Sequence, residues 1–285
     1  MNEGFWYLAV LNLFYLKLFL PICLLIVFSF PSAAQNLISV CSWNLKDLGK
    51  SKSDTEIKII ADIVKEFDVV AIQEVVAGSG GPQAISRLHN ELNRTGSKWD
   101  YVLSDPTSSS SYKTERYAFL WKPSKLKKIG DAWLERNYHI EIDREPFYIT
   151  FNSNGKDFTL VNFHAITKSM QPEREIKYFK FLPATYSKLN LIFAGDFNVP
   201  ASHTVFIPLR KLGYTSALTD QKTSLKQTCI NNDCLSSEFD NFYFAKSRIK
   251  GHKSGIIPFY ESFNDHREAR LISDHVPIFF QFSLN

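Results

Sequence analysis

The sequence predicts an α/β fold built from apolar strands with helices between them. Residues 37–44, LISVCSWN, and 68–72, DVVAI, are apolar runs of strand length. Between them, residues 57–67 carry isoleucine, valine and phenylalanine at helical spacing. A strand, a helix and a second strand of these lengths form one unit of an α/β layer. Because further strands follow without an internal repeat or linker, we expect a single α/β sandwich over residues 35–285.

The composition is consistent with such a domain. The chain has 285 residues, of which 45% are hydrophobic and 14% aromatic, which suits a large packed core and argues against disorder. The formal net charge is +4, which is compatible with a polyanionic substrate but too small to establish one. The substrate class must therefore come from the motifs.

The N-terminal residues have the pattern of an export signal. Residues 18–30, LFLPICLLIVFSF, follow Lys17 without a charge, and the small residues of PSAA come next. This pattern predicts a signal peptide over residues 1–34, cleaved before Gln35, and hence a secreted or periplasmic protein. An uncleaved membrane anchor over residues 5–30 is the alternative.

The cysteines are consistent with export. Cys229 and Cys234 bracket the polar loop INND, and in an exported protein a local disulfide is the favoured interpretation. A metal-binding pair is the alternative, but no second cysteine or histidine pair has the spacing to complete a site. Cys23 lies in the export segment, and Cys41 is expected to be a small buried hydrophobic residue.

Helix starts and turns separate the remaining strands. Ser53 and Glu56 form a capping box before the first helix, and Pro82 is expected to start the next one. Residues 105–116 are a long serine-rich loop, and Asn154-Gly155 is a hairpin turn signal. We expect the other strands at residues 101–103, 117–121, 147–151, 158–163, 191–194, 240–244 and 276–282.

The stretch LIFAGDFNVP at residues 191–200 combines a buried strand with polar residues at its end. Gly195 is expected to turn the backbone tightly after Ala194. Asp196 and Asn198 are two residues apart, so their side chains can converge on one ligand. The alternative is an Asx turn, in which both side chains bond their own backbone.

Other predicted strands end in the same manner, which suggests one polar rim. This set is rich in carboxylate and amide oxygens and has no thiolate, so it favours Mg²⁺, Ca²⁺ or Mn²⁺ over zinc. Two histidines and spare carboxylates provide for the proton transfers that phosphodiester hydrolysis requires. The residues are Asn44, Glu74, His164, Asp196, Asn198, Asp240, Asp274 and His275.

These strand ends carry motifs that resemble, in order, those of the endonuclease/exonuclease/phosphatase superfamily. Within it, the chain is most similar to deoxyribonuclease I-like nucleases, because residues 101–123 and the REP of residues 144–146 resemble segments that contact DNA. The resemblance implies a four-layer α/β sandwich of two packed mixed β-sheets flanked by helices. The motifs are WNL at 43–45, IQEV at 72–75, NFHA at 162–165, GDFN at 195–198, FDN at 239–241 and SDHVP at 273–277.

The resemblance also implies a metal site. Glu74 is expected to be the main metal carboxylate, supported by Asn44, and Asp274 is expected to help hold the metal or position water. Mg²⁺ is the expected ion, with Ca²⁺ or Mn²⁺ as alternatives. A loop ion pair is the other interpretation of Asp274-His275.

Two acid–base pairs follow from the same resemblance. His275 is expected to be oriented by Asp240, and His164 by Glu115. Asp196 and Asn198 are expected to bind the phosphate or the attacking water. The alternative for Glu115 is a solvated charge beside Arg116.

DNA contacts are expected from Tyr112, Arg116 and Arg144, whose basic or aromatic side chains position a backbone rather than specify a sequence. The alternative for Arg144 is an ion pair with Glu141 or Asp143. Two departures from the family pattern concern this surface. The family has an arginine where this chain has Val76, and the loop at residues 108–114 is one residue longer.

The predicted function is that of an exported, metal-dependent endonuclease that hydrolyses DNA with low sequence specificity. The first alternative is a phosphodiesterase or phosphatase on the same scaffold that acts on a lipid, RNA or nucleotide. The second is a binding or scaffold protein with an inactive site. DNA is the expected partner of a monomer with no protein partner, and membrane contact is expected only if the N-terminal segment stays uncleaved.

Overall fold

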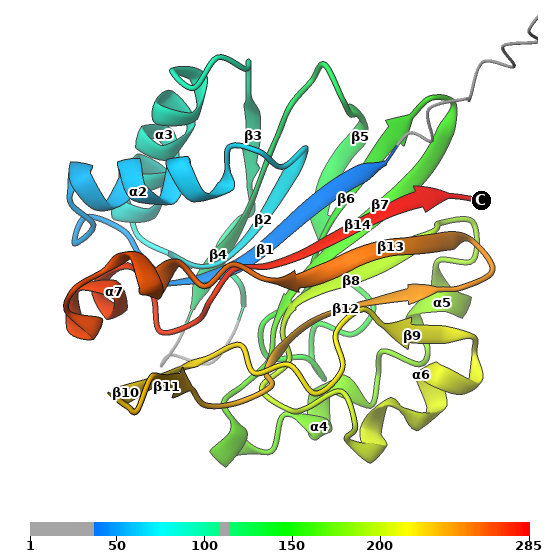
Figure 1. The fold of residues 1–285 in the computed structure, drawn as a ribbon. Coiled ribbons are helices and arrows are strands. Elements are labelled where there is room, and N and C mark those ends of the chain that lie inside the picture. The colour runs from blue at the N-terminus through cyan, green and yellow to red at the C-terminus, as the bar shows by residue number, and fades with distance from the viewer. Residues whose placement is uncertain (1–36, 109–113) are drawn as a thin grey trace, which may run out of the picture. The chain divides into compact units, whose positions relative to one another are not determined.

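The computed structural model describes residues 37–108 and 114–285, which form two β-sheets packed face to face with helices on both outer sides (Figure 1). This is the four-layer α/β sandwich that the sequence predicts. The predicted signal peptide at residues 1–34 and the predicted DNA contact Tyr112 lie outside the described residues. In the ranges 37–108 and 114–285, no helix has the length and hydropathy to cross a membrane.

The first sheet has six strands and contains one parallel pair. Helix α2 (Asp54–Val64) makes the crossover between the two parallel strands, as the strand–helix–strand pattern predicts. It begins at the expected capping box, in which Ser53 and Glu56 bond each other's backbone amides. In spatial order the strands are β13 (Ile249–Ile256), β14 (Ile278–Leu284), β1 (Ile38–Leu48), β2 (Val69–Val76), β4 (Glu115–Trp121) and β3 (Asp100–Leu103).

The second sheet also has six strands and is also mixed. Its parallel pair is β7 and β8, and β6 and β7 form the hairpin expected at Asn154-Gly155. Both turn residues have positive φ, as a two-residue hairpin turn requires. In spatial order the strands are β5 (Lys127–Leu134), β6 (Phe147–Ser153), β7 (Lys156–His164), β8 (Leu191–Asp196), β12 (Asp240–Ala245) and β9 (Tyr214–Ser216).

Aromatic side chains fill the layer between the sheets. Trp121 of the first sheet packs against Phe151 of the second with ring centroids 5.5 Å apart, and Phe158 packs against Phe282 at the same distance. Each buried phenylalanine contributes roughly 1.5–3 kcal/mol relative to an exposed one. The sheets are therefore held as a rigid pair, and their adjoining edges can carry a shared site.

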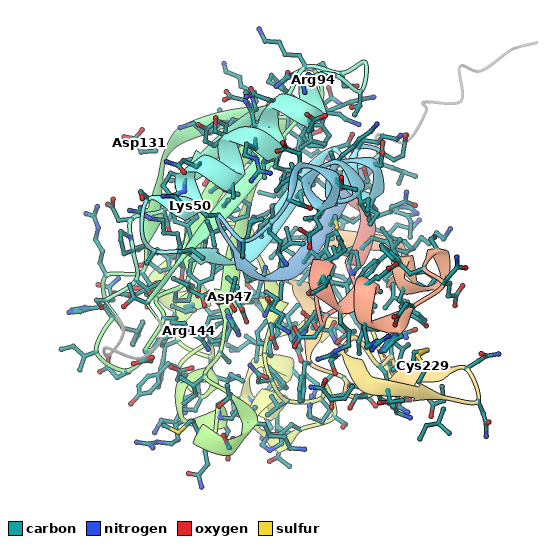
Figure 2. All side chains as sticks on the ribbon, turned by 90° about the vertical axis from the view of Figure 1, so that its left-hand side faces the viewer. Asp47, Lys50, Arg94, Asp131, Arg144 and Cys229 are labelled. Atoms are coloured by element: carbon teal, nitrogen blue, oxygen red, sulfur yellow. A yellow bond between two sulfur atoms is a disulfide. The ribbon has the colours of Figure 1, made fainter. Side chains whose placement is uncertain are left out.

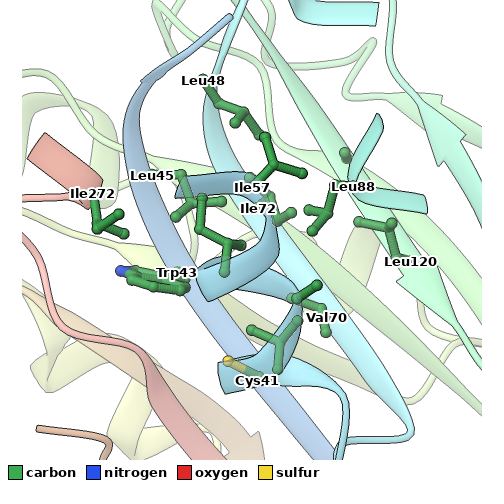
Figure 3. Packing of buried hydrophobic residues seen from close by; sticks show 14 of the residues in the cluster. Cys41, Trp43, Leu45, Leu48, Ile57, Val70, Ile72, Leu88, Leu120 and Ile272 are labelled. Atoms are coloured by element: carbon green, nitrogen blue, oxygen red, sulfur yellow. The ribbon is translucent and has the colours of Figure 1, made fainter. Parts of the chain in front are cut away.

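Helices cover the outer faces of both sheets. Trp43 and Ile72 of the first sheet pack against Ile57 of α2 and Leu88 of α3 (Gly80–Asn93), as Figure 3 shows. Helix α3 begins two residues before Pro82, the predicted start. The other helices are α7 (His266–Ile272), over the first sheet, and α4 (Glu173–Ile176), α5 (Leu182–Thr185) and α6 (Ile207–Lys211), over the second.

A short two-stranded hairpin of β10 (Leu225–Ile230) and β11 (Asp233–Leu235) stands apart from both sheets. Cys229 and Cys234 form a disulfide across it, as predicted. Cys41 is a buried free thiol, also as predicted, and burial raises its pKa well above the usual value. Three 3₁₀ turns complete the described elements: η1 (Lys168–Met170), η2 (Thr204–Phe206) and η3 (Phe259–Ser262).

Candidate active site

The end of β8 is the centre of the site, because strand register aligns three functional side chains there. His164, the last residue of β7, is the parallel partner of Asp196, the last residue of β8. Asp240, the first residue of β12, is the antiparallel partner of the same Asp196. Residues distant in the sequence thus meet at one sheet edge, as the strand-end pattern predicts.

The first sheet contributes Asn44 and Glu74 to the same place. The Asn44 side-chain amide donates to Glu74 Oε1 at 3.0 Å and to Asp196 Oδ2 at 3.3 Å, and so links the two sheets. Beneath it, the Gln73 amide donates to Asn162 Oδ1 at 2.6 Å. Buried polar groups that bond each other across a sheet interface fix the relative position of the sheets.

Gly195 has a different role from the one predicted. It lies inside β8 rather than in a turn, with φ at +137°. A Cβ atom at this position would lie 1.9 Å from the carbonyl oxygen of Phe163 in β7. Glycine is therefore required by the close approach of the parallel strand that carries His164.

Asp196 makes the Asx interaction and also faces two histidines, whereas its convergence with Asn198 on one ligand stays a prediction. Its Oδ1 accepts the backbone N–H of Asn198 at 2.9 Å, which is the Asx interaction. Its Oδ2 lies 3.5 Å from Nε2 of His164 and 3.5 Å from Nε2 of His275. The Asn198 amide donates to the Ala165 carbonyl at 3.1 Å, which anchors the segment after the strand.

Two histidine–carboxylate pairs flank Asp196, as the family resemblance implies. His164 Nδ1 lies 3.0 Å from Glu115 Oε2, and His275 Nδ1 lies 2.7 Å from Asp240 Oδ2. A carboxylate can only accept, so each Nδ1 carries the hydrogen of its pair. In both pairs the Nε2 atom is the one that faces Asp196.

The two imidazoles have opposite electrostatic environments. Burial and the charge of Arg144 lower the pKa of His164 to about 3. Burial would also lower the pKa of His275, but the carboxylates of Asp240 and Asp196 outweigh it and raise the pKa to about 10. Burial raises the pKa of Asp196 itself. One ring is thus an acceptor at Nε2 and the other a donor.

Arg144 lies in the interior, and the DNA contact expected of it stays a prediction. Its side chain is 2% exposed and donates to Glu115 Oε2 at 3.1 Å and to the Ala165 carbonyl. Its Nη1 is also 3.2 Å from His164 Nδ1. Because little free surface remains for a DNA strand, this position supports a role in holding Glu115 and His164.

Arg116 also makes contacts within the protein. Its guanidinium donates to the carbonyl of Ala77 at 2.9 Å and to that of Ser104 at 2.6 Å. The residue is half-buried, so part of it remains accessible to a ligand. Contact with a substrate by Arg116 or Tyr112 stays a prediction.

Residues that the sequence did not single out position the His275 pair. Thr223 donates to Asp240 Oδ2 at 2.6 Å. The Ser273 hydroxyl accepts the His275 N–H at 2.9 Å and donates to the Asn44 carbonyl at 2.5 Å. Buried Lys52 donates to the last carbonyls of α7, directly before this segment. No motif in the sequence indicates these roles, although Ser273 is part of the SDHVP motif.

The residues present fit a hard divalent cation. Ligand atoms of Asp196, Asp240 and His275 lie within 4.8 Å of one another. Asp240 Oδ1 is buried without a hydrogen-bond partner, which is costly unless a cation or water satisfies it. A donor set of carboxylates and imidazole suits Mg²⁺ or Mn²⁺.

The metal ligands predicted from the sequence lie beside this group and are not members of it. Glu74 has a positive φ of 58° and borders a cavity of about 220 Å³ with Asp47 and Val76. Its carboxylate is 3.8 Å from His164 Nε2. Asp274 lies 3.7 Å from Lys46 Nζ and 3.6 Å from an Arg270 nitrogen. Glu74 is thus in the site, whereas Asp274 is engaged in partly exposed ion pairs.

Comparison with known families agrees with this geometry. Residues 41–275 match the model of the Endonuclease/Exonuclease/phosphatase family, so the chain belongs to this family. The chain is thus a phosphodiesterase of this family with distant homology to deoxyribonucleases.

Two characterised relatives carry deoxyribonuclease names. The chain is 29% identical to "Deoxyribonuclease" of Thioalkalivibrio sp. (strain K90mix) over 92% of this chain and 75% of that protein. It is 26% identical to "Deoxyribonuclease-1" of Bos taurus over 85% of this chain and 90% of that one. Among solved structures, a family protein from Bacteroides thetaiotaomicron matches with a TM-score of 0.65 at 16% identity, covering 87% of this chain and 98% of that chain. The last match supports the fold alone.

Proposed function

We propose that this protein is an exported, metal-dependent endonuclease that hydrolyses DNA with low sequence specificity. The observation that carries the proposal is the convergence of two histidine–carboxylate pairs on Asp196. The names of the two relatives support DNA as the substrate class. The SAA-type site before Gln35 supports export, with a membrane anchor at residues 5–30 as the alternative.

The two histidines can carry out different proton transfers of the reaction. The Nε2 atoms of His164 and His275 face the same carboxylate, so one can take a proton from water while the other gives one to the leaving oxygen. Glu115 and Asp240 hold the two rings in the tautomer that this requires. Because these side chains are buried and already in position, the protein does not have to rearrange them when the reaction occurs.

A divalent ion, Mg²⁺ or alternatively Ca²⁺ or Mn²⁺, would neutralise a non-bridging phosphate oxygen when bound. Glu74 with Asn44 would hold it as the sequence predicts, and the group of Asp196, Asp240 and His275, with the unpartnered oxygen of Asp240, offers a second position beside them. Low sequence specificity is consistent with a site that addresses the phosphodiester, since phosphate contacts carry no sequence information directly.

A second candidate is a phosphodiesterase or phosphatase that acts on a lipid, RNA or nucleotide. It is favoured by Val76, which makes the wall of the cavity beside Glu74 apolar where the related nucleases are expected to carry arginine. The burial of Arg144 leaves little of its side chain exposed for the second DNA contact that the sequence predicts. A binding protein with an inactive site is disfavoured, because both catalytic pairs are complete.

Nicking of supercoiled plasmid by the purified protein tests the proposal. The reaction is run with Mg²⁺ or Ca²⁺, with and without EDTA, beside His164→Ala and the exposed control His139→Ala. Nicking that EDTA and His164→Ala abolish, and His139→Ala leaves unchanged, is the expected result. A folded, metal-binding protein that does not nick DNA would exclude the nuclease, and cleavage of RNA, nucleotide or lipid phosphodiesters would then identify the second candidate.

A further inference from the structure

The hairpin of β10 and β11 brings its two cysteines to a histidine that is distant in the sequence. Figure 2 shows Cys229 on this hairpin, and Cys234 is its disulfide partner. Ligand atoms of Cys229, Cys234 and His266, the first residue of α7, all lie within 4.8 Å of one another. The third ligand that the cysteine spacing lacks in the sequence is thus supplied by the fold.

The imidazole of His266 is already oriented by the hairpin. Its Nε2 lies 2.8 Å from the carbonyl oxygen of Lys226 in β10. Because a carbonyl only accepts, Nε2 carries the hydrogen and Nδ1 carries the lone pair. Histidines that ligate metals commonly donate their other ring nitrogen to a backbone carbonyl in this way.

We propose that reduction of the Cys229–Cys234 disulfide converts this corner of the molecule into a metal site for Zn²⁺ or a similarly thiophilic ion, with His266 as the third protein ligand. Two thiolates and one imidazole form a soft donor set that selects zinc over magnesium. Water would complete a tetrahedron as the fourth ligand. The site is separate from the hard-ligand group at Asp196.

The disulfide becomes a metal site in two steps, reduction and metal binding. A dithiol reductant breaks the S–S bond by exchange, so that the protein gains two thiols and the reductant becomes a disulfide. Binding of one Zn²⁺ then releases one proton from each thiol and forms two Zn–S bonds. The protein is not otherwise oxidised or reduced.

The local structure can accommodate the change. The turn between the cysteines contains Asn231 and Asn232, both exposed and both with positive φ. In a tetrahedral zinc site the sulfurs lie about 3.8 Å apart, as Zn–S bonds of about 2.3 Å require. The two side chains can reach this separation by rotation on a hairpin that is free of both sheets.

A metal at this position would join the hairpin to α7. These elements already contact each other, because Arg270 of α7 donates to the Leu225 carbonyl at 2.8 Å and the Leu225 N–H donates to the Asp274 carbonyl at 2.7 Å. Reduction removes the covalent link within the hairpin, and the metal replaces it with a link that also includes His266. We therefore expect Zn²⁺ to raise the Tm of the reduced protein and not that of the disulfide form.

Cobalt titration tests the site, because only thiolate ligands give a near-ultraviolet thiolate-to-Co²⁺ charge-transfer band. The protein carries Cys23→Ser, so that Cys41, Cys229 and Cys234 are its remaining cysteines, and is reduced, desalted and titrated without oxygen. We expect the band at one Co²⁺ per chain in the reduced protein, its loss on addition of Zn²⁺, and no band in the disulfide form. Cys41→Ala, which removes the buried free thiol, is the matched control and should leave the band unchanged.

Variants of the three ligands decide whether the site is the proposed one. Cys229→Ser and Cys234→Ser should each reduce the charge-transfer intensity, and His266→Ala should weaken Co²⁺ affinity at least about tenfold. Absence of the band in the reduced protein, or unchanged affinity in folded His266→Ala, would overturn the proposal. X-ray absorption of the zinc-loaded protein gives an answer that does not depend on a variant: two sulfur ligands and one imidazole are expected, and any other sulfur count contradicts the assignment.

Discussion

The guanidinium of Arg144 lies 3.1 Å from the carboxylate of Glu115, and both side chains are almost completely buried. Glu115 in turn holds His164 Nδ1 at 3.0 Å. The arginine therefore contacts the Glu115–His164 pair from the interior of the protein. This arrangement changes what a substitution at Arg144 should do.

Arg144→Ala should reduce hydrolysis of DNA and of a small aryl phosphodiester by the same factor. Both reactions use Glu115 and His164, which the arginine positions, and the small substrate has no flanking DNA to contact. Removing one partner of a buried ion pair should also cost about 3–5 kcal/mol in the free energy of unfolding. The measurements are kcat/KM on both substrates and urea unfolding.

The control for Arg144→Ala is Arg267→Ala, which breaks an exposed pair with Asp265. It should leave the free energy of unfolding nearly unchanged, because solvent screens an exposed ion pair. A loss confined to DNA in Arg144→Ala would restore the direct DNA contact that the sequence predicted.

His164→Ala and His275→Ala should each lower kcat by roughly 10²–10⁴, the usual range for loss of a general acid or base. Both rings present Nε2 to Asp196, so neither can substitute for the other. Steady-state rates on plasmid and on the aryl diester measure the effect. Wild-type rates in either variant, with His139→Ala as the exposed control, would show that the pair is not catalytic.

Glu74→Gln should weaken the apparent affinity of the enzyme for Mg²⁺. The substitution keeps the size of the side chain and removes the charge that a cation requires, so the Mg²⁺ concentration for half-maximal activity should rise at least about tenfold. Glu91→Gln on α3, whose partner is the surface Arg94, is the matched control. An unchanged Mg²⁺ dependence in Glu74→Gln would move the metal to Asp196 and Asp240 alone.

Gly195→Ala should destabilise the protein by at least about 2 kcal/mol, because backbone strain and a clash with Phe163 act together. Gly155→Ala is a matched control, since Gly155 also has positive φ but has open space around it. It should cost about 1 kcal/mol, from the backbone alone. If Gly195→Ala and Gly155→Ala lost the same stability in thermal or urea unfolding, the close approach of β7 to β8 would have no energetic consequence.

The Asp240–His275 pair should make the stability of the metal-free protein depend on pH. Burial lowers the pKa of His275, but Asp240, Asp196 and Asp274 raise it to about 10, above the about 6.5 of an unfolded histidine. The stabilisation is therefore fully present below the unfolded value and is lost as pH rises through the folded one.

We expect the free energy of unfolding, measured with urea in EDTA, to fall as the pH rises from the unfolded to the folded pKa of His275. Asp240→Asn should flatten the profile, because it removes the nearest carboxylate from the ring. A wild-type slope in Asp240→Asn would mean that another group titrates there.

Edge strands are the main part of the fold that the sequence did not predict. β5 and β13 are edge strands of their sheets, carry mainly exposed or half-buried side chains, and are interrupted by glycine or by a register shift. Because one side of an edge strand is open to solvent, it need not show the apolar run of a buried strand. Central strands such as β2 and β8 were predicted because both of their faces are buried.

The sequence by itself determined the α/β class, the central strands, the capping box, the β6–β7 hairpin and the polar residues at the strand ends. Each of these depends on local spacing, since periodicity, capping and turn preference act over a few residues. It also indicated that polar side chains such as His164 and Asp196 would meet, because the carboxyl ends of parallel strands lie at one edge.

Only the tertiary structure decided the roles of Arg144, Gly195 and His266. The burial of an arginine depends on which carboxylate faces it, and the need for glycine depends on how closely a neighbouring strand approaches. A third ligand for the cysteine pair depends on how α7 docks on the hairpin. Contacts between distant segments set all three, and such contacts leave no local pattern in the chain.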